Sequence, residues 1–154
     1  MIRVLFVCLG NICRSPMAEA ILRHRVREAG LQHQIEVDSA GTGYWHVGEP
    51  PHRGTRGILD TYRISYEGMV ARQIEKDDLE SFDYVLTMDN MNLSDVRSLG
   101  TGRAVVRPLL SYAPELGITE VPDPYYTGGF EGVYRMVDAA CTHLLAEIRR
   151  EHTL

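Results

Sequence analysis

Cys8 and Arg14, two residues near the start of the chain, have side chains and a spacing suited to nucleophilic chemistry on an oxyanion. Five residues separate them, and Ser15 follows directly. A thiolate is a strong nucleophile, and a guanidinium can bind two oxygens of one tetrahedral oxyanion. Five residues are enough for the backbone to curl round such an anion and return the guanidinium to the thiol. The spacing therefore predicts an anion-binding loop with a cysteine nucleophile.

The residues that flank this loop predict a strand before it and a helix after it. Residues 2–7 are apolar and typical of a buried parallel strand, and residues 17–29 have a helical apolar face with Ser15 as the expected N-cap. The loop consists of Leu9, Gly10, Asn11, Ile12 and Cys13. Its N–H groups and the helix dipole favour an anion. We expect Asn11 to hold the loop in shape and the Ser15 hydroxyl to donate to the Cys8 sulfur.

A candidate proton donor lies far along the chain, in a long connection over residues 111–129. Asp123 stands there between two prolines, and Tyr125 and Tyr126 follow it. Phosphoryl transfer from an ester oxygen needs a proton for the leaving group, and a carboxyl near a bound phosphate dianion keeps its proton more readily. Long connections in compact domains are often functional. We therefore predict that Asp123 is a general acid and that the tyrosines form the wall of a pocket.

The remaining chain alternates strands and helices within what we expect to be a single domain over residues 1–154. The pattern predicts further strands at 35–38, 84–88 and 104–108, helices at 53–63 and 131–151, and a short helical turn near 77–78. Residues 89–92 are predicted to form a turn that leads into a helix through Leu99. This alternation predicts a four-stranded parallel α/β sheet with helices on both faces. Ligands in such sheets bind beyond the carboxyl ends of the strands, where we expect the cysteine loop, the 39–43 segment and the turn at Asp89 to meet.

Composition narrows the classes of function. A net charge of −5 without a basic cluster argues against nucleic-acid binding. No apolar run is long enough to span a membrane, and Met1 leads directly into a strand rather than a signal peptide. Three cysteines, two of them in one loop, make a poor disulfide framework and favour a cytoplasmic location. The histidines lack metal-ligand spacing, so we expect neither a metal nor a cofactor.

In five motifs along its whole length the chain resembles the low-molecular-weight protein tyrosine phosphatases. The motifs are Val7–Ser15 with Pro16-Met17-Ala18-Glu19, Asp38-Ser39-Ala40-Gly41-Thr42, Ala71-Arg72-Gln73, Thr87-Met88-Asp89 and Asp123-Pro124-Tyr125-Tyr126. The resemblance implies a flavodoxin-like fold and hydrolysis of phosphotyrosine and small aryl phosphates through a phosphocysteine intermediate, without a cofactor. It implies that Cys8 is the nucleophile, that Arg14 clamps the phosphate, and that Asp123 acts first as acid and then as base.

The same resemblance assigns supporting roles. Asn11, Ser15 and Ser39 match positions that support the loop by hydrogen bonds. Trp45 and Tyr125 match the walls beside the phosphotyrosine ring, and Tyr126 is expected to border the same pocket. Cys13 matches a second cysteine that forms a reversible disulfide with Cys8 under oxidation. Many members carry a histidine where this chain has Met69, which implies different support of Asn11.

Other functions on this scaffold remain as alternatives. Protein arginine phosphatases resemble the chain, but they tend to carry threonine where Ile12 stands and to lack the Tyr125-Tyr126 pair. Arsenate reductases need two more cysteines after the third strand, whereas residues 87–99 contain none and Cys141 is expected in the core. A non-catalytic anion-binding or redox-sensing module would not require Arg14. We expect the partner to be a phosphotyrosine protein or a small phosphate ester, and the protein to be a monomer or a weak dimer.

Overall fold

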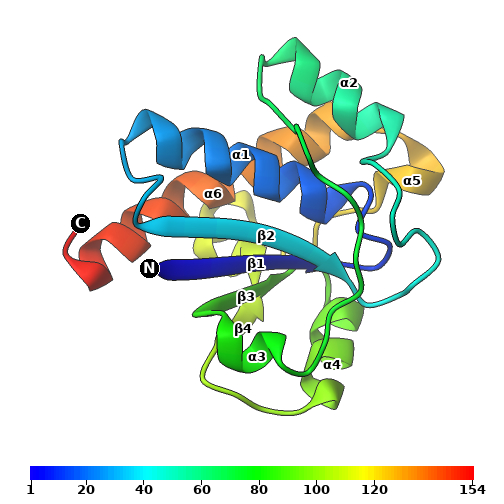
Figure 1. Cartoon of the computed structure of the whole chain (residues 1–154). Coiled ribbons are helices and arrows are strands. Elements are labelled where there is room, and N and C mark those ends of the chain that lie inside the picture. Colours follow the sequence, from blue (N-terminus) through cyan, green and yellow to red (C-terminus); the bar gives the residue numbers. More distant parts are fainter.

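The computed structural model describes residues 1–154 as an α/β fold built on a four-stranded parallel sheet of order β2-β1-β3-β4 (Figure 1). The strands are β1 (Ile2–Cys8), β2 (Ile35–Gly41), β3 (Tyr84–Thr87) and β4 (Val105–Pro108). The predicted fold class is confirmed. All strand pairs are parallel, so the loops that follow β1, β2 and β3 leave the same edge of the sheet.

Helices cover both faces of the sheet. They are α1 (Arg14–Glu28), α2 (Arg53–Thr61), α3 (Asp78–Ser81), α4 (Asn90–Leu99), α5 (Pro124–Thr127) and α6 (Phe130–His152), with 3₁₀ turns at Leu109–Tyr112 and Pro114–Leu116. Helices α1 and α6 pack on each other over one face, and α3 and α4 lie across the other (Figure 1). None of the helices combines the length and the apolar character needed to cross a membrane.

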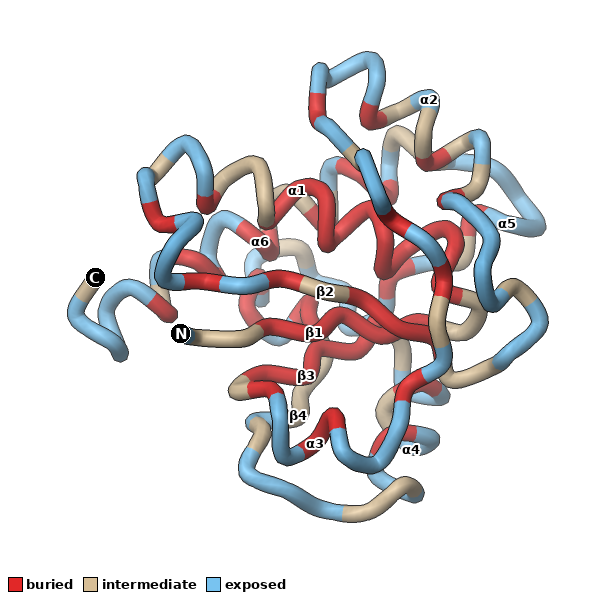
Figure 2. Tube along the Cα trace, in the orientation of Figure 1, coloured by how far each residue is buried: buried red, intermediate tan, exposed pale blue.

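Strand β1 is the centre of the core because its side chains alternate between the two faces. Val4, Phe6 and Cys8 belong to the larger apolar cluster, with residues of α1 and α6. Leu5 and Val7 belong to the smaller cluster, with residues of α3 and α4. Full burial of one such apolar side chain contributes about 1.5–3 kcal/mol. Figure 2 shows this buried band running through β1 and into α1. The nucleophile loop is therefore anchored at one end in the best-packed strand.

The structure corrects two predictions at the edge of the sheet. Strand β2 continues to Gly41 instead of ending at residue 38, because Cys8 at the end of β1 pairs with Gly41. Ser15 is not the N-cap of α1, which begins at Arg14 after Cys13 and has no side-chain cap. Its hydroxyl oxygen instead lies within hydrogen-bond distance of the Cys8 sulfur. Strands β3 and β4 and helices α2 and α6 begin and end within two residues of the predicted positions, whereas α4 already begins at Asn90, inside the predicted turn. The long connection contains α5 and the two 3₁₀ turns.

Candidate active site

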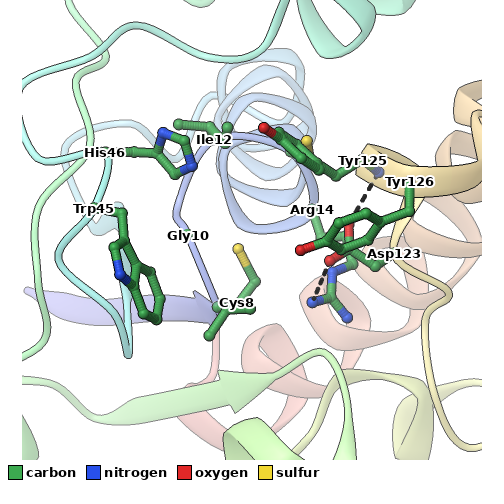
Figure 3. A pocket seen from close by; sticks show the side chains of 11 residues that line it. Cys8, Gly10, Ile12, Arg14, Trp45, His46, Asp123, Tyr125 and Tyr126 are labelled. Atoms are coloured by element: carbon green, nitrogen blue, oxygen red, sulfur yellow. Dashed lines mark hydrogen bonds and ion pairs between the residues drawn. The ribbon is translucent and has the colours of Figure 1, made fainter.

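A cavity of about 240 Å³ opens at the carboxyl ends of the strands (Figure 3). It is lined by residues from three segments, the β1–α1 loop, the turn after β2 and the start of α5: Cys8, Leu9, Gly10, Ile12, Cys13, Arg14, Trp45, His46, Asp123, Tyr125 and Tyr126. The remaining predicted site residues, Asn11, Ser15 and Ser39, are buried and do not line this cavity. The fold thus brings together residues more than a hundred positions apart in the sequence.

The β1–α1 loop has its carbonyl groups tied to other segments. Carbonyl oxygens of the loop accept N–H bonds from outside it, at 2.9 Å from Thr42 to Cys8, 2.9 Å from Gly43 to Leu9 and 2.7 Å from His52 to Ile12. The backbone N–H groups of Leu9, Gly10, Ile12 and Cys13 have no acceptor within the chain. Polar N–H groups left unpaired in a loop at a helix N-terminus form an anion-binding concavity.

Asn11 holds an unusual backbone conformation in the middle of this loop. Its φ is 55°, a left-handed value that costs a residue with a Cβ about 1–2 kcal/mol. The Asn11 side chain offsets this cost, since its amide nitrogen donates to Ser15 Oγ at 2.8 Å and to Ser39 Oγ at 2.9 Å. Its oxygen accepts from the backbone N–H of Arg72 at 3.0 Å. A Cβ added at Gly41 would lie 2.8 Å from the Leu9 carbonyl oxygen, so the loop packs directly on the end of β2.

Cys8 lies at the floor of the cavity and is 2% exposed. Its sulfur is 2.9 Å from Ser15 Oγ and accepts from the backbone N–H of Asn11 at 3.3 Å. Ser15 Oγ already accepts a hydrogen from Asn11, so its own hydrogen is available to donate to the sulfur. Two hydrogen-bond donors therefore point at the sulfur and fix its position at the floor of the cavity.

Arg14 reaches the opposite side of the cavity and is 3% exposed. Its Nη1 donates to Asp89 Oδ2 at 2.7 Å and to the Val121 carbonyl at 3.0 Å, and its Nη2 lies 3.6 Å from Asp123 Oδ2. Burial acts against the charge, but Cys8, Asp89 and Asp123 outweigh it and hold the Arg14 pKa above its ordinary value. The guanidinium therefore stays charged, and its Nε–Nη2 edge makes no hydrogen bond to the protein.

The Asp89 contact was not predicted from the sequence, although Asp89 was placed at the correct edge of the sheet. Asp89 is the N-cap of α4, where its Oδ1 accepts from the N–H of Asn92 at 2.8 Å. One sequence signal could have indicated this contact. Asp89 is a helix-capping residue just after β3, at the same edge of the sheet as the loop that ends in Arg14. Its second carboxylate oxygen is free to pair with that arginine.

Asp123 and the aromatic residues form the mouth of the cavity. Asp123 Oδ1 accepts from the N–H of Tyr125 at 3.0 Å, which caps α5, and Oδ2 faces Arg14. Tyr125 and Tyr126 lie edge to face with ring centroids 5.0 Å apart. Trp45 stands on the other side of the opening with Cys8 between the two walls (Figure 3). The opening is thus a slot between aromatic side chains that ends at the Cys8 sulfur.

Cys13, Met69 and Cys141 are also buried. Cys13 is 4% exposed, and burial foremost, together with the neighbouring Cys8 and Asp123, raises the pKa of its thiol to about 12. Met69 is buried behind the loop and lines a small cavity with Asn11. Cys141 is fully buried in the main cluster, and its predicted place in the core is confirmed. No three His, Cys, Asp or Glu side chains lie close enough together to hold a metal ion.

Residues 3–154 match the family described as low molecular weight phosphotyrosine protein phosphatase. The chain is 49% identical to the low molecular weight protein-tyrosine-phosphatase YfkJ of Bacillus subtilis over the full length of both. It matches the crystal structure of YfkJ with a TM-score of 0.95 at 50% identity, covering 98% of this chain and 96% of that one.

A second solved structure is relevant to the choice of substrate. DARP, a Drosophila arginine phosphatase, matches with a TM-score of 0.89 at 34% identity, over 95% of this chain and 97% of that one. Relatives that share this fold are therefore named for different activities, YfkJ as a protein-tyrosine-phosphatase and DARP as an arginine phosphatase. Both the family match and the identity to YfkJ extend over nearly the whole chain. The chain belongs to the low molecular weight phosphotyrosine protein phosphatase family.

Proposed function

We propose that this protein hydrolyses phosphotyrosine, and small aryl phosphates, in two steps through a phosphocysteine intermediate on Cys8. The observation that carries the proposal is the convergence on one aromatic-walled cavity of a buried thiol, a charged guanidinium and a carboxyl. Each of these three groups supplies something that the reaction needs: a nucleophile, a clamp for the phosphoryl oxygens and a proton for the leaving group.

In the first step the unpaired N–H groups of the loop and the Nε–Nη2 edge of Arg14 bind the phosphoryl oxygens. The Cys8 sulfur attacks phosphorus from the side opposite the ester oxygen. The bond from phosphorus to the phenolic oxygen breaks, and Asp123 donates its proton to that oxygen. A phenolate is a poor leaving group, so this proton is worth more for phosphotyrosine than for an aryl phosphate with a more acidic phenol.

In the second step the phosphocysteine is hydrolysed. The Asp123 carboxylate accepts a proton from a water molecule, whose oxygen attacks phosphorus while the bond from sulfur to phosphorus breaks. The Ser15 hydroxyl donates to the departing sulfur and stabilises it as a thiolate. Inorganic phosphate leaves, and both Cys8 and Asp123 return to their starting forms.

The aromatic slot favours phosphotyrosine over other phosphate esters. A phenyl ring fits between Trp45 on one side and Tyr125 with Tyr126 on the other, where offset or edge-to-face contacts contribute about 0.5–1.5 kcal/mol each. Ile12 adds an apolar side chain to the lining of the cavity. Phosphoarginine is the second candidate, and the likeness to DARP is the observation in its favour.

The experiment compares kcat/KM for a phosphotyrosine peptide and for the same peptide carrying phosphoarginine. We expect phosphotyrosine to be preferred, and Cys8→Ser to be inactive on both. Asp123→Asn is expected to lose more activity on phenyl phosphate than on p-nitrophenyl phosphate, because the better leaving group needs the proton less. Activity that survives in Cys8→Ser would refute the mechanism, whereas a preference for phosphoarginine would replace only the substrate.

We also propose that residues 1–154 act as a single cytoplasmic domain, as a monomer or a weak dimer. All three cysteines are free and buried, which suits a reducing compartment. Sedimentation equilibrium over a range of protein concentrations tests the oligomeric state. Expression with a fluorescent tag tests the location.

A further inference from the structure

Glu19 is a buried carboxyl on α1 that takes no part in the reaction steps above. It is 3% exposed and does not line the substrate cavity. We propose that Glu19 is a positioning residue for the Cys8 sulfur, to which it is linked by a chain of three side chains, Ser39, Asn11 and Ser15. This inference rests on the proposed role of Cys8 as the nucleophile.

The contacts between these residues form an unbroken chain of hydrogen bonds. Ser39 Oγ donates to Glu19 Oε1 at 2.6 Å. The Asn11 amide nitrogen donates to Ser39 Oγ at 2.9 Å and to Ser15 Oγ at 2.8 Å. Ser15 Oγ lies 2.9 Å from the Cys8 sulfur. All five residues are at most 4% exposed, so water does not substitute for any of these partners.

The number of hydrogens on each side chain fixes the direction of every hydrogen bond between Glu19 and Cys8. The Asn11 amide has two hydrogens, and both go to serine oxygens. Each serine therefore accepts from Asn11 and has one hydrogen left to donate, Ser39 to Glu19 and Ser15 to Cys8. The amide cannot turn over, because its oxygen already accepts from the N–H of Arg72. The chain is held by an acceptor at each end, the carboxylate of Glu19 and the sulfur.

If the side chain at position 19 could not accept a hydrogen bond, Ser39 would lose the partner to which its hydroxyl donates. The hydrogen of Ser39 would be buried with no partner, and turning it toward Asn11 would break the bond that Asn11 donates. Asn11 would then be held on one side only, although its left-handed backbone shapes the loop round Cys8. The other side chains that share a small cavity with Asn11 and Ser39 are apolar and offer no substitute: Pro16, Pro51, Met69, Val70 and Ala71.

The charges round Glu19 make this acceptor sensitive to pH. Arg23, one turn along α1, pairs with Glu19 Oε2. Asp38 on β2 and Arg72, in the segment between α2 and α3, also lie close enough to act on the charge of the carboxyl. Burial outweighs the favourable contacts and raises the pKa of Glu19 to about 7. The Glu19 side chain that accepts from Ser39 therefore changes from a neutral carboxyl to a carboxylate as the pH rises through about 7. A protonated carboxyl competes for the same contact as a donor, which loosens the chain.

Two substitutions at position 19 test the proposal. Glu19→Met has a similar size and removes the acceptor, whereas Glu19→Gln keeps an acceptor oxygen but cannot titrate. We expect Glu19→Met to lower kcat/KM at pH 7 by about threefold to tenfold and to change the rate of Cys8 alkylation by iodoacetate at the same pH. We expect Glu19→Gln to recover most of kcat/KM but to lose the step near pH 7 in its pH profile. Glu28→Gln, exposed on the same helix, is the matched control.

Ser39→Ala tests whether Glu19 acts on Cys8 through the hydrogen bonds of Ser39, Asn11 and Ser15. We expect Glu19→Met to add no further loss in the Ser39→Ala background. Additive losses, equal losses in Glu19→Met and Glu19→Gln, or a wild-type alkylation rate in Glu19→Met would each overturn the proposal. Alkylation reports on the Cys8 sulfur directly, so this result is distinct from activity surviving in Cys8→Ser, which would refute the nucleophile itself.

Discussion

Replacing Asp89 by asparagine is expected to weaken catalysis, because Asp89 orients the Arg14 guanidinium. Asp89 Oδ2 holds Nη1 of Arg14 at 2.7 Å, and the only other acceptor at that nitrogen is the Val121 carbonyl. Nε and Nη2 are left to bind two phosphoryl oxygens. Asparagine has nearly the same shape and also caps helices well, so α4 should still begin at the same residue.

The size of the effect follows from the bond that is lost. A hydrogen bond to a charged group contributes about 1.5–3 kcal/mol, and the Val121 carbonyl retains part of the orientation. A loss of about 1–2 kcal/mol in transition-state stabilisation corresponds to a fall in kcat/KM of about fivefold to thirtyfold. The Arg14 side chain is almost fully buried, so solvent screening reduces this figure little.

The assay is kcat/KM on phenyl phosphate, together with the inhibition constant of inorganic phosphate. Asp95→Asn is the matched control, since Asp95 lies on the same helix, is exposed and makes no ion pair. It should leave both constants unchanged. Circular dichroism of both variants establishes that the fold is intact.

The opposite result would refute the argument. If Asp89 only competed with substrate for Arg14, removing its charge would tighten phosphate binding and raise kcat/KM. An increase in both, or a fall of equal size in Asp95→Asn, would show that Asp89 does not orient the guanidinium.

Three further outcomes are expected. Iodoacetate at pH 7 should label Cys8 and spare Cys13, whose pKa is raised to about 12 by burial. Gly41→Ala should lower the free energy of unfolding by about 1–3 kcal/mol, because its Cβ would meet a loop carbonyl oxygen at 2.8 Å. Burial raises the pKa of Glu19 from 4.5 to about 7. The contribution of this raised pKa to the free energy of unfolding is fully present below pH 4.5 and is lost as the pH rises through 7. Relative to Glu19→Gln, the wild type should therefore lose about 3 kcal/mol over that range.

Each of these outcomes has its own measurement. Peptide mass spectrometry locates the alkylated cysteine, and equal labelling of both would contradict the raised pKa of Cys13. Urea denaturation measures the Gly41→Ala effect against Gly57→Ala, whose Cβ meets nothing inside α2 and should stabilise the protein by about 0.5–1 kcal/mol. Urea denaturation at several pH values tests Glu19, and parallel curves for the wild type and Glu19→Gln would be inconsistent with a raised pKa.

Much of the fold could be predicted because its signals are local. The apolar run before Cys8 and the alternation of strands with helices were enough to predict a parallel sheet with its loops at one edge. The error in Ser15 has a physical origin. A serine at the start of a helix can cap it or can serve a neighbouring side chain, and only the positions of Cys8 and Asn11 decide between these roles.

The hydrogen-bonded partners of the loop were harder to predict, because each depends on contacts between distant segments. The pairing of Arg14 with Asp89 joins residues 75 positions apart, and no local pattern marks it. Glu19 lies in the second turn of α1, and nothing in its local sequence distinguishes it from an ordinary acidic residue of a helix. Its hydrogen bond to Ser39 arises only because β2 runs beside α1.

The arrangement at the loop concentrates groups that, taken singly, destabilise a folded chain. Asn11 has a left-handed backbone, Arg14 carries a buried charge and Glu19 is a buried carboxyl, and all three are joined to the same loop. A left-handed residue alone is not informative, since Arg63 and Thr153 share that conformation in exposed turns. What distinguishes the loop is strain combined with burial, which survives only where surrounding contacts determine the geometry fully. Substitutions that relieve this strain should stabilise the protein at the expense of the fixed position of the Cys8 sulfur.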